Sequence, residues 1–143
     1  MANISTGSAK YEGFGKSGKG HVSTGSGALK DQPYGFNTRF EDAPGTDPEE
    51  LIGAAHASCF TMALAFQLAD KGFSDGTIET TCDVTLEKDG DGFKVSKSAL
   101  SVKGGGDGLD RATFEECAKT AKENCPLSKL LDTQITLETE FTG

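Results

Sequence analysis

The spacing of apolar and polar positions divides the chain into a turn-rich first part, one long apolar run and a second alternating part. Before residue 41, short β-like runs such as Tyr11–Phe14 and Gly20–Thr24 are separated by glycines, which is typical of short strands joined by tight turns. We therefore predict a β-meander over about 8–41. Its last strand is expected at 36–40, after a turn at 33–35.

A long helix is predicted over about 47–71. Either Thr46 or Asp47 can cap its first turn, Pro48 suits that turn, and a glutamate follows three residues after either cap. Gly72 then supplies the stop signal. The residues between are apolar on nearly every face, so we expect a central helix that is buried all round.

A membrane span is the alternative interpretation of this apolar run. Such a span needs about 20 consecutive and predominantly apolar residues. Polar side chains interrupt the run, and polar, glycine-rich sequence flanks it on both sides; the interrupting residues are His56, Ser58, Thr61 and Gln67. A core helix is therefore favoured, and no membrane partner is expected.

After the helix, apolar and polar residues alternate, which predicts strands. A hairpin is expected over about 77–103, with its turn in the Asp-Gly-Asp-Gly sequence at 89–92. In the return strand the apolar phase shifts from odd to even positions. This shift predicts a bulge near Lys97 and Ser98.

The last elements complete an α+β fold. Helices are predicted over about 110–131, where Asp110 can cap the first and Pro126 can begin the second. A final strand is predicted over about 134–141, because its apolar residues alternate. The order of elements favours antiparallel β-sheets around the long helix. With 143 residues, the chain is expected to form a single domain, 1–143.

Charge and the first residues exclude several classes of function. With 22 acidic and 14 basic residues the formal charge is -8, so nucleic acid is not an expected partner. The segment from Gly13 to Gly20 imitates a phosphate loop, but Gly20 stands where that loop needs Ser or Thr. No charged segment followed by an apolar core opens the chain, which predicts a cytoplasmic protein.

Cysteine chemistry is the main remaining candidate. Four cysteines without a leader segment favour reduced thiols over a secreted disulfide framework, and no CxxC pair supports a zinc site. Cys82 falls on the apolar face of a strand and Cys117 on that of a helix, so both are interpreted as small core residues. No bound metal is expected.

Cys125 and Cys59 have more informative surroundings. Cys125 directly precedes Pro126, at the expected start of a short helix, where free N–H groups favour a thiolate. From position alone, a loop cysteine without a role is an equal alternative. Cys59 follows a run of small residues at 53–58, broken only by His56, which leaves space beside the sulfur for a substrate or another chain.

Two further residues could support a reactive thiol. His56 could act as a base or as half of a metal site, but with His21 as the only other histidine a hydrogen-bonded core residue is favoured. An ordinary thiol, with a pKa of about 8.5, is only about 3% thiolate at pH 7. Activation therefore calls for a fixed cation, and Arg39, in a strand-like segment between aromatic residues, is a candidate. By itself it could equally form an exposed ion pair.

Three segments of the chain resemble the OsmC/Ohr family of osmotically inducible and organic hydroperoxide resistance proteins. They are QPYGFNTRF at 32–40, GTDPEELIGAAHASCF at 45–60 and CPLS at 125–128. The likeness covers almost the whole chain, and two cysteine motifs in this order are specific. The segment at 32–40 is closer to the OsmC branch of the family.

The resemblance implies an OsmC-like fold and a thiol peroxidase that reduces organic hydroperoxides, and hydrogen peroxide more weakly, in defence against oxidative and osmotic stress. It implies that Cys59 attacks the peroxide and becomes a sulfenic acid, which Cys125 resolves as a disulfide. Arg39 would stabilise the thiolate and the bound peroxide, and Glu49 would orient Arg39. It also implies no bound cofactor, and electrons from a dihydrolipoyl-type thiol on a lipoylated protein or from another dithiol.

Helix geometry bears on the expected assembly. Glu49 and Cys59 are ten residues apart on the long helix, a rise of about 15 Å that is too great for one local site. Two such helices packed antiparallel across a twofold axis would bring Glu49 of one chain near Cys59 of the other. We therefore expect a homodimer with interface sites, and the resemblance likewise implies an intertwined homodimer.

Two other functions remain open at this stage. A Cys-His acyl hydrolase would use Cys59 and His56 and would need no second cysteine. A non-catalytic module would use the apolar helix and its small residues to line a pocket for a lipid-like ligand.

Overall fold

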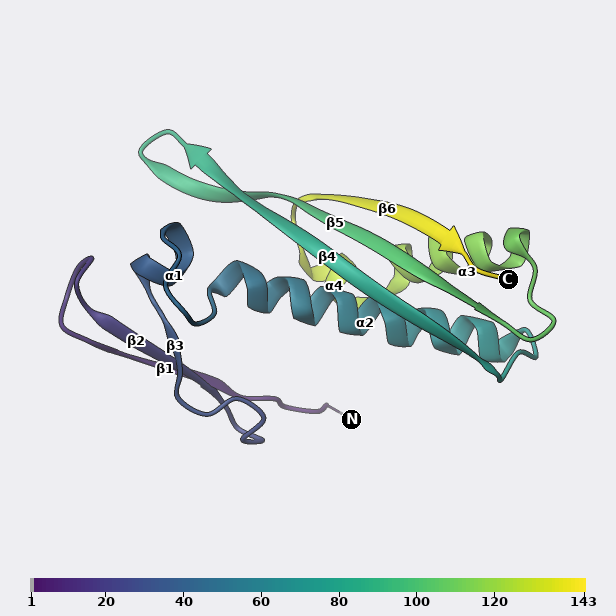
Figure 1. Cartoon of the computed structure of the whole chain (residues 1–143), viewed down its shortest axis with the longest axis horizontal. Coiled ribbons are helices and arrows are strands. Elements are labelled where there is room, and N and C mark those ends of the chain that lie inside the picture. The colour runs from purple at the N-terminus through teal and green to yellow at the C-terminus, as the bar shows by residue number, and fades with distance from the viewer. Residues whose placement is uncertain (1) are drawn as a thin grey trace. The chain divides into compact units, whose positions relative to one another are not determined.

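The structure is a computed structural model that describes residues 2–143. The chain forms two compact units, one that ends at Leu51 and one from Ile52 to Gly143. Figure 1 labels the elements, which in chain order are β1 (Gly7–Glu12), β2 (Lys19–Thr24), β3 (Gln32–Tyr34), α1 (Phe36–Phe40), α2 (Pro48–Asp70), β4 (Gly76–Asp89), β5 (Gly92–Gly106), α3 (Arg111–Asn124), α4 (Pro126–Leu130) and β6 (Gln134–Phe141). The predicted α+β class is confirmed.

The first unit contains an antiparallel sheet in the order β1-β2-β3. The predicted meander is confirmed, but the segment at 33–35 is not a simple turn, because Pro33 pairs with His21 within β3. An edge strand accepts proline because one side of that strand needs no N–H donor.

The predicted strand at 36–40 is wrong, because these residues form helix α1. The Gly35 N–H donates to Thr38 Oγ1 over 2.8 Å, and the Thr38 hydroxyl donates to the Gly35 carbonyl over 3.0 Å. The Arg39 N–H donates to the same carbonyl over 3.1 Å. These three bonds close one helical turn, which the alternation of aromatic and polar residues did not reveal.

In the second unit, β5 is the central strand of a three-stranded sheet, between β4 and β6 (Figure 1). The predicted hairpin is confirmed, since β4 and β5 pair antiparallel. Thr85 pairs with Lys97 and Leu86 with Val95, which leaves Ser96 as the bulged residue, next to the predicted position. The expectation of antiparallel pairing is wrong for β6, which runs parallel to β5. The crossover that a parallel pair requires is supplied by α3 and α4.

Helix α2 begins and ends as its terminal residues predict. Asp47 Oδ1 accepts the Glu50 N–H over 2.7 Å, so Asp47 rather than Thr46 is the cap. At the other end Gly72 has a φ of 97°, in the left-handed region that favours glycine. Asp110 stands at the N-cap of α3 but makes no side-chain cap bond there.

The core of the second unit lies between α2, α3 and β5. Its fully buried members come from one face of each element and include Phe60 and Leu64, Leu100 and Val102, and Phe114 and Ala118. The expectation that α2 is buried all round is wrong for a single chain, because only one face of the helix packs into this core. The side chains of Met62 and Phe66, on another face, are 59% and 64% exposed.

Helix α2 also has the length and composition of a membrane-crossing segment, with a mean hydropathy of 1.5 over its most apolar window. A core helix of a folded protein has the same properties. The contacts of Phe60 and Leu64 with the core of the second unit are those of a core helix.

Gly53 allows α2 to approach β4 closely. A Cβ atom at this position would lie 2.9 Å from the carbonyl oxygen of Cys82.

We expect Gly53→Val to lower the free energy of unfolding by about 2 kcal/mol through overpacking, measured by urea denaturation. Ala69→Val, at an exposed position of the same helix, is the matched control and should cost less than about 1 kcal/mol. Equally small losses in both variants would contradict this close approach.

Candidate active site

Cys125 joins α3 to α4 and caps the second of these helices. Its backbone is extended, with φ −63° and ψ 134°, and Pro126 follows as the first residue of α4. The Ser128 N–H donates to Cys125 Sγ over 3.4 Å, and the Ser128 hydroxyl donates to the same sulfur over 3.5 Å. The residue is fully buried, so these two donors take the place of water.

Cys59 lies on α2, where it is partly buried against the core. Cys59 and Cys125 are near enough to shift each other's pKa, and the backbone of Leu127 acts on the pKa of both. Both cysteines are free thiols in this structure. The structure therefore brings together the two cysteines that the sequence singles out, although they stand on α2 and at the start of α4.

The two thiols differ in acidity. Burial raises the pKa of Cys59; the Leu127 N–H opposes this effect and the neighbouring Cys125 adds to it. Burial also raises the pKa of Cys125, but hydrogen bonds from Ser128, Cys59 and Leu127 outweigh it and leave the pKa below its ordinary value. Because the two thiols act on each other, the pair titrates as a unit. The lowered pKa of Cys125 and the raised pKa of Cys59 favour the first ionisation at Cys125.

Cys59 therefore needs a cation to become the anionic member of the pair. Among the described residues 52–143, the groups that shift its pKa are Cys125 and Leu127, and neither is a cation. A positive charge placed beside Cys59 would favour its thiolate and leave the proton on Cys125.

Arg39 and Glu49 form a bidentate ion pair within the first unit. Arg39 Nε donates to Glu49 Oε1 and Nη2 donates to Oε2, both over 2.7 Å. The Glu49 side chain is only 11% exposed. Its hydrogen bonds raise the pKa of Arg39, against the effect of burial. The guanidinium is therefore charged and held in one orientation, as a fixed cation must be.

A pocket of about 350 Å³ opens beside Arg39. Much of its lining is aromatic and includes Tyr11, Tyr34, Phe36 and Phe40. The Arg39 guanidinium stands 5.5 Å from the centre of the Phe40 ring. This volume lies within the range of small-molecule sites, and the lining combines apolar surface with a directed charge.

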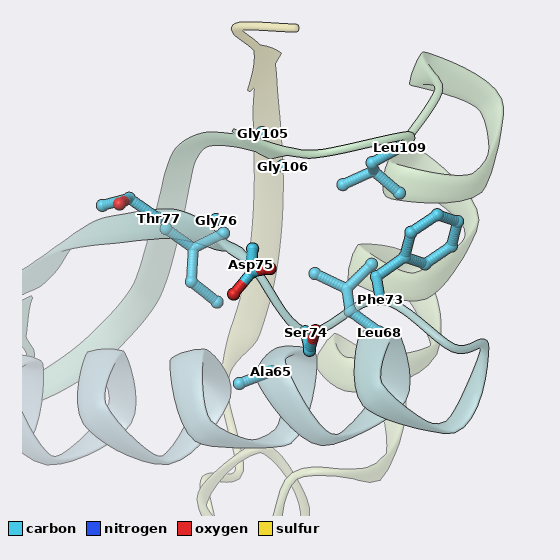
Figure 2. Close-up of a pocket in the computed structure, with 11 residues that line it drawn as sticks. Ala65, Leu68, Phe73, Ser74, Asp75, Gly76, Thr77, Gly105, Gly106 and Leu109 are labelled. Carbon is cyan, nitrogen blue, oxygen red and sulfur yellow. The ribbon is translucent and has the colours of Figure 1, made fainter.

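A second pocket, at the C-terminal end of α2, is a poorer candidate (Figure 2). Leu68, Phe73 and Leu109 contribute apolar side chains to its lining, and Asp75 contributes a carboxylate. Its volume is about 100 Å³, below the range of typical ligand sites. None of the described residues that line it is a cysteine, so it offers no thiol chemistry.

His56 is the hydrogen-bonded core histidine that the sequence favoured. It is fully buried, its Nδ1 lies 2.7 Å from Ser98 Oγ, and its Nε2 lies 2.9 Å from Ser128 Oγ. Burial lowers its pKa, so the ring is neutral near pH 7. Because serine hydroxyls occupy both nitrogens, neither is free to act as a base for Cys59, which weakens the hydrolase alternative.

The remaining cysteines differ in their surroundings. Cys117 is 2% exposed within the core, as predicted for a small apolar residue. Cys82 packs against the core, and its sulfur also lies 3.1 Å from Ser98 Oγ and 3.8 Å from His56 Nδ1. Among residues 2–143, no three His, Cys, Asp or Glu side chains form a group that could hold a metal.

Sequence reasoning missed Ser98 and Ser128. Ser98 occupies a fully buried position of β5, two residues after the bulged Ser96. The sequence signal for Ser98 was a serine at an inward-facing strand position that lies opposite a histidine of a helix. This pairing can be recognised only when the register of β5 is known.

Stability should depend on pH through His56. Its unfolded pKa is about 6.5 and its folded pKa is lower, so the unfolded chain binds the proton first as the pH falls. The contribution is full above about pH 6.5 and is lost below it, by at most about 1.4 kcal/mol per pH unit. Urea unfolding at about pH 7 and about pH 5 should show a smaller loss in His56→Gln than in the wild type. Equal losses would refute this assignment.

Comparisons of the sequence and of the structure with known proteins point to the same family. Residues 40–140 match the family model of OsmC-like proteins. Peroxiredoxin OsmC of Escherichia coli is 52% identical over 132 residues, 92% of each chain. The crystal structure of the organic hydroperoxide resistance protein OhrB of Bacillus subtilis is 30% identical, with a TM-score of 0.65 over 96% of this chain and 98% of that one. An OsmC-like protein from Mycoplasma pneumoniae shares the fold, with a TM-score of 0.77 over the whole of both chains at 11% identity. The chain therefore belongs to the OsmC family and is a peroxidase.

Proposed function

We propose that this peroxidase reduces organic hydroperoxides to alcohols, and hydrogen peroxide more weakly, by a two-cysteine mechanism. The observation that carries the proposal is the pair of neighbouring free thiols, Cys59 and Cys125. Two neighbouring thiols can form a disulfide with little movement of the elements that carry them. A cytoplasmic role in defence against oxidative and osmotic stress is consistent with free thiols.

In the first step, the Cys59 thiolate attacks the terminal oxygen of the hydroperoxide. An S–O bond forms, the O–O bond breaks, and the leaving alkoxide takes a proton to become the alcohol. In the second step, the Cys125 thiolate attacks the sulfur of the Cys59 sulfenic acid, and hydroxide leaves and is protonated to water. The products are one alcohol, one water and one disulfide for each hydroperoxide.

Arg39 would supply the cation that the second unit does not provide to Cys59. Its charge would stabilise the Cys59 thiolate and the oxygen that leaves the peroxide, and Glu49 would hold the guanidinium in place. The aromatic pocket beside Arg39 would bind the organic group of the substrate. Hydrogen peroxide has no such group, which explains the proposed preference.

The disulfide must be reduced before the next turnover. We propose a dihydrolipoyl-type dithiol, on a lipoylated protein or free, because two neighbouring thiols can open a disulfide by successive exchange and leave as a ring disulfide. The thiols and the arginine are side chains of the chain itself, so the proposed chemistry uses no bound cofactor.

The site would be completed in a homodimer. Glu49 and Cys59 are separated by about 15 Å of rise along α2, and this helix keeps Met62 and Phe66 largely exposed within one chain. Antiparallel packing of two α2 helices would cover these apolar side chains. It would also bring the Arg39–Glu49 pair of one chain toward Cys59 of the other.

Turnover assays test the two-cysteine mechanism. With dihydrolipoamide as reductant, the wild type should consume cumene hydroperoxide faster than hydrogen peroxide. Cys59→Ser should abolish consumption, and Cys125→Ser should allow one turnover without recycling by the dithiol. Cys117→Ser, a change at a core thiol outside the pair, is the control and should keep wild-type turnover. Negligible consumption by every protein would favour a binding module.

Mixed dimers test where the arginine comes from. A heterodimer of Cys59→Ser and Arg39→Ala chains, isolated through two different tags, should show about half the wild-type turnover per dimer, because one of its two sites keeps both residues. The corresponding homodimers should both be nearly inactive. A heterodimer no more active than its parents, or an active wild-type monomer, would rule out shared sites.

A further inference from the structure

We infer that His56 is a positioning residue for the resolving step, because it makes the Ser128 hydroxyl a donor to Cys125 Sγ. The inference rests on the proposed function, in which Cys125 attacks as a thiolate. His56 touches neither substrate nor reacting sulfur; it acts through one serine. The contacts involved form a continuous array from β4 to the start of α4.

The array contains five side chains. Cys82 Sγ lies 3.1 Å from Ser98 Oγ, which lies 2.7 Å from His56 Nδ1. On the other side of the ring, Nε2 lies 2.9 Å from Ser128 Oγ, which lies 3.5 Å from Cys125 Sγ. His56, Ser98 and Cys125 are each fully buried, and Ser128 and Cys82 are partly buried, so water does not compete for the bond between His56 and Ser98 at the centre of the array.

The number of available protons determines which group donates each hydrogen bond of the array. Each serine hydroxyl has one proton, and a neutral imidazole has one N–H and one acceptor nitrogen. If the Ser128 hydroxyl donates to Cys125, its oxygen must accept from His56 Nε2–H. Nδ1 then accepts from Ser98, whose oxygen can accept the Cys82 S–H. Every donor therefore points toward Cys125, which suits an anion there.

The opposite direction requires the Cys125 S–H to point at Ser128. In that arrangement the Cys125 S–H donates to Ser128, Ser128 donates to Nε2, and the His56 proton resides on Nδ1 and faces Ser98. The tautomer of His56 thus follows the direction of the hydrogen bond between Ser128 and Cys125. Removing the imidazole leaves the Ser128 proton free to turn away, and the thiolate loses a donor.

A single-turnover experiment separates the two chemical steps. Reduced protein is mixed with one equivalent of cumene hydroperoxide, and loss of peroxide and formation of disulfide are followed separately. His56→Leu should slow disulfide formation about tenfold, the loss expected when a charge-assisted hydrogen bond is removed, and should slow peroxide loss less. His56→Gln should recover to within about threefold, because its amide N–H can replace Nε2–H. Disulfide formation at the wild-type rate in His56→Leu, or no rescue by His56→Gln, would overturn the inference.

Two further variants guard against a folding defect. Ser128→Ala removes one partly buried hydroxyl and cuts the same link, so it should slow disulfide formation as His56→Leu does. The double variant should be no slower than either single variant. Thr61→Val is the matched control, because it breaks a 2.6 Å bond between α2 and Thr80 of β4 that is not part of the array. It should keep the wild-type rate; slowing equal to that of His56→Leu would show a general packing effect and overturn the inference.

Ring-nitrogen NMR of reduced protein tests the array without peroxide. With Cys125 ionised, His56 should carry its proton on Nε2, and Cys125→Ser should weaken this preference. A ring protonated on Nδ1 while Cys125 is ionised would overturn the inference even if the two-cysteine mechanism held. The expected tautomer in a protein that consumes no peroxide would support the array and refute the proposed function instead.

Discussion

Two thiols can act on each other's ionisation only if the elements that carry them are held close together, and in this protein the buried face of α2 holds Cys59 beside Cys125. Gly53 allows the helix to approach β4, and Phe60 places the next turn in the core. His56 then links the same face to β5 and α4 through two serines. Cys59, one turn from His56, consequently stands beside Cys125. Core packing and thiol chemistry therefore depend on the same helix face.

This packing places negative charge more readily on Cys125 than on Cys59. The N-cap position and Ser128 supply donors to Cys125, whereas burial, and after it the neighbouring Cys125, raises the pKa of Cys59. Such a pair is suited to resolution but needs an outside charge for attack. The Arg39–Glu49 ion pair, a fixed cation beside an aromatic pocket, is suited to supply that charge. The exposed apolar side chains of α2 are consistent with the second copy of the chain that would bring it there.

The sequence correctly predicted the elements that depend on interactions between residues close together in the chain. The cap at Asp47, the glycine stop at Gly72 and the alternation in β4 and β6 each act within a few residues. The parallel pairing of β6 could not be read in this way, because it depends on where α3 and α4 return the chain. Helix α1 was missed because one hydroxyl, that of Thr38, closes its turn.

Prediction from the sequence reaches the same limit at the candidate site. The two cysteines could be singled out from their motifs, but the relative acidity of the thiols depends on donors from Ser128 and Leu127 that only the fold brings together. The array through His56 requires the register of β5. The most direct test of the central claim is peptide mapping of reduced protein after one equivalent of an organic hydroperoxide. We predict a single disulfide between Cys59 and Cys125, with Cys82 and Cys117 still thiols; a disulfide that includes Cys82, or oxidised Cys59 beside a free Cys125, would contradict it.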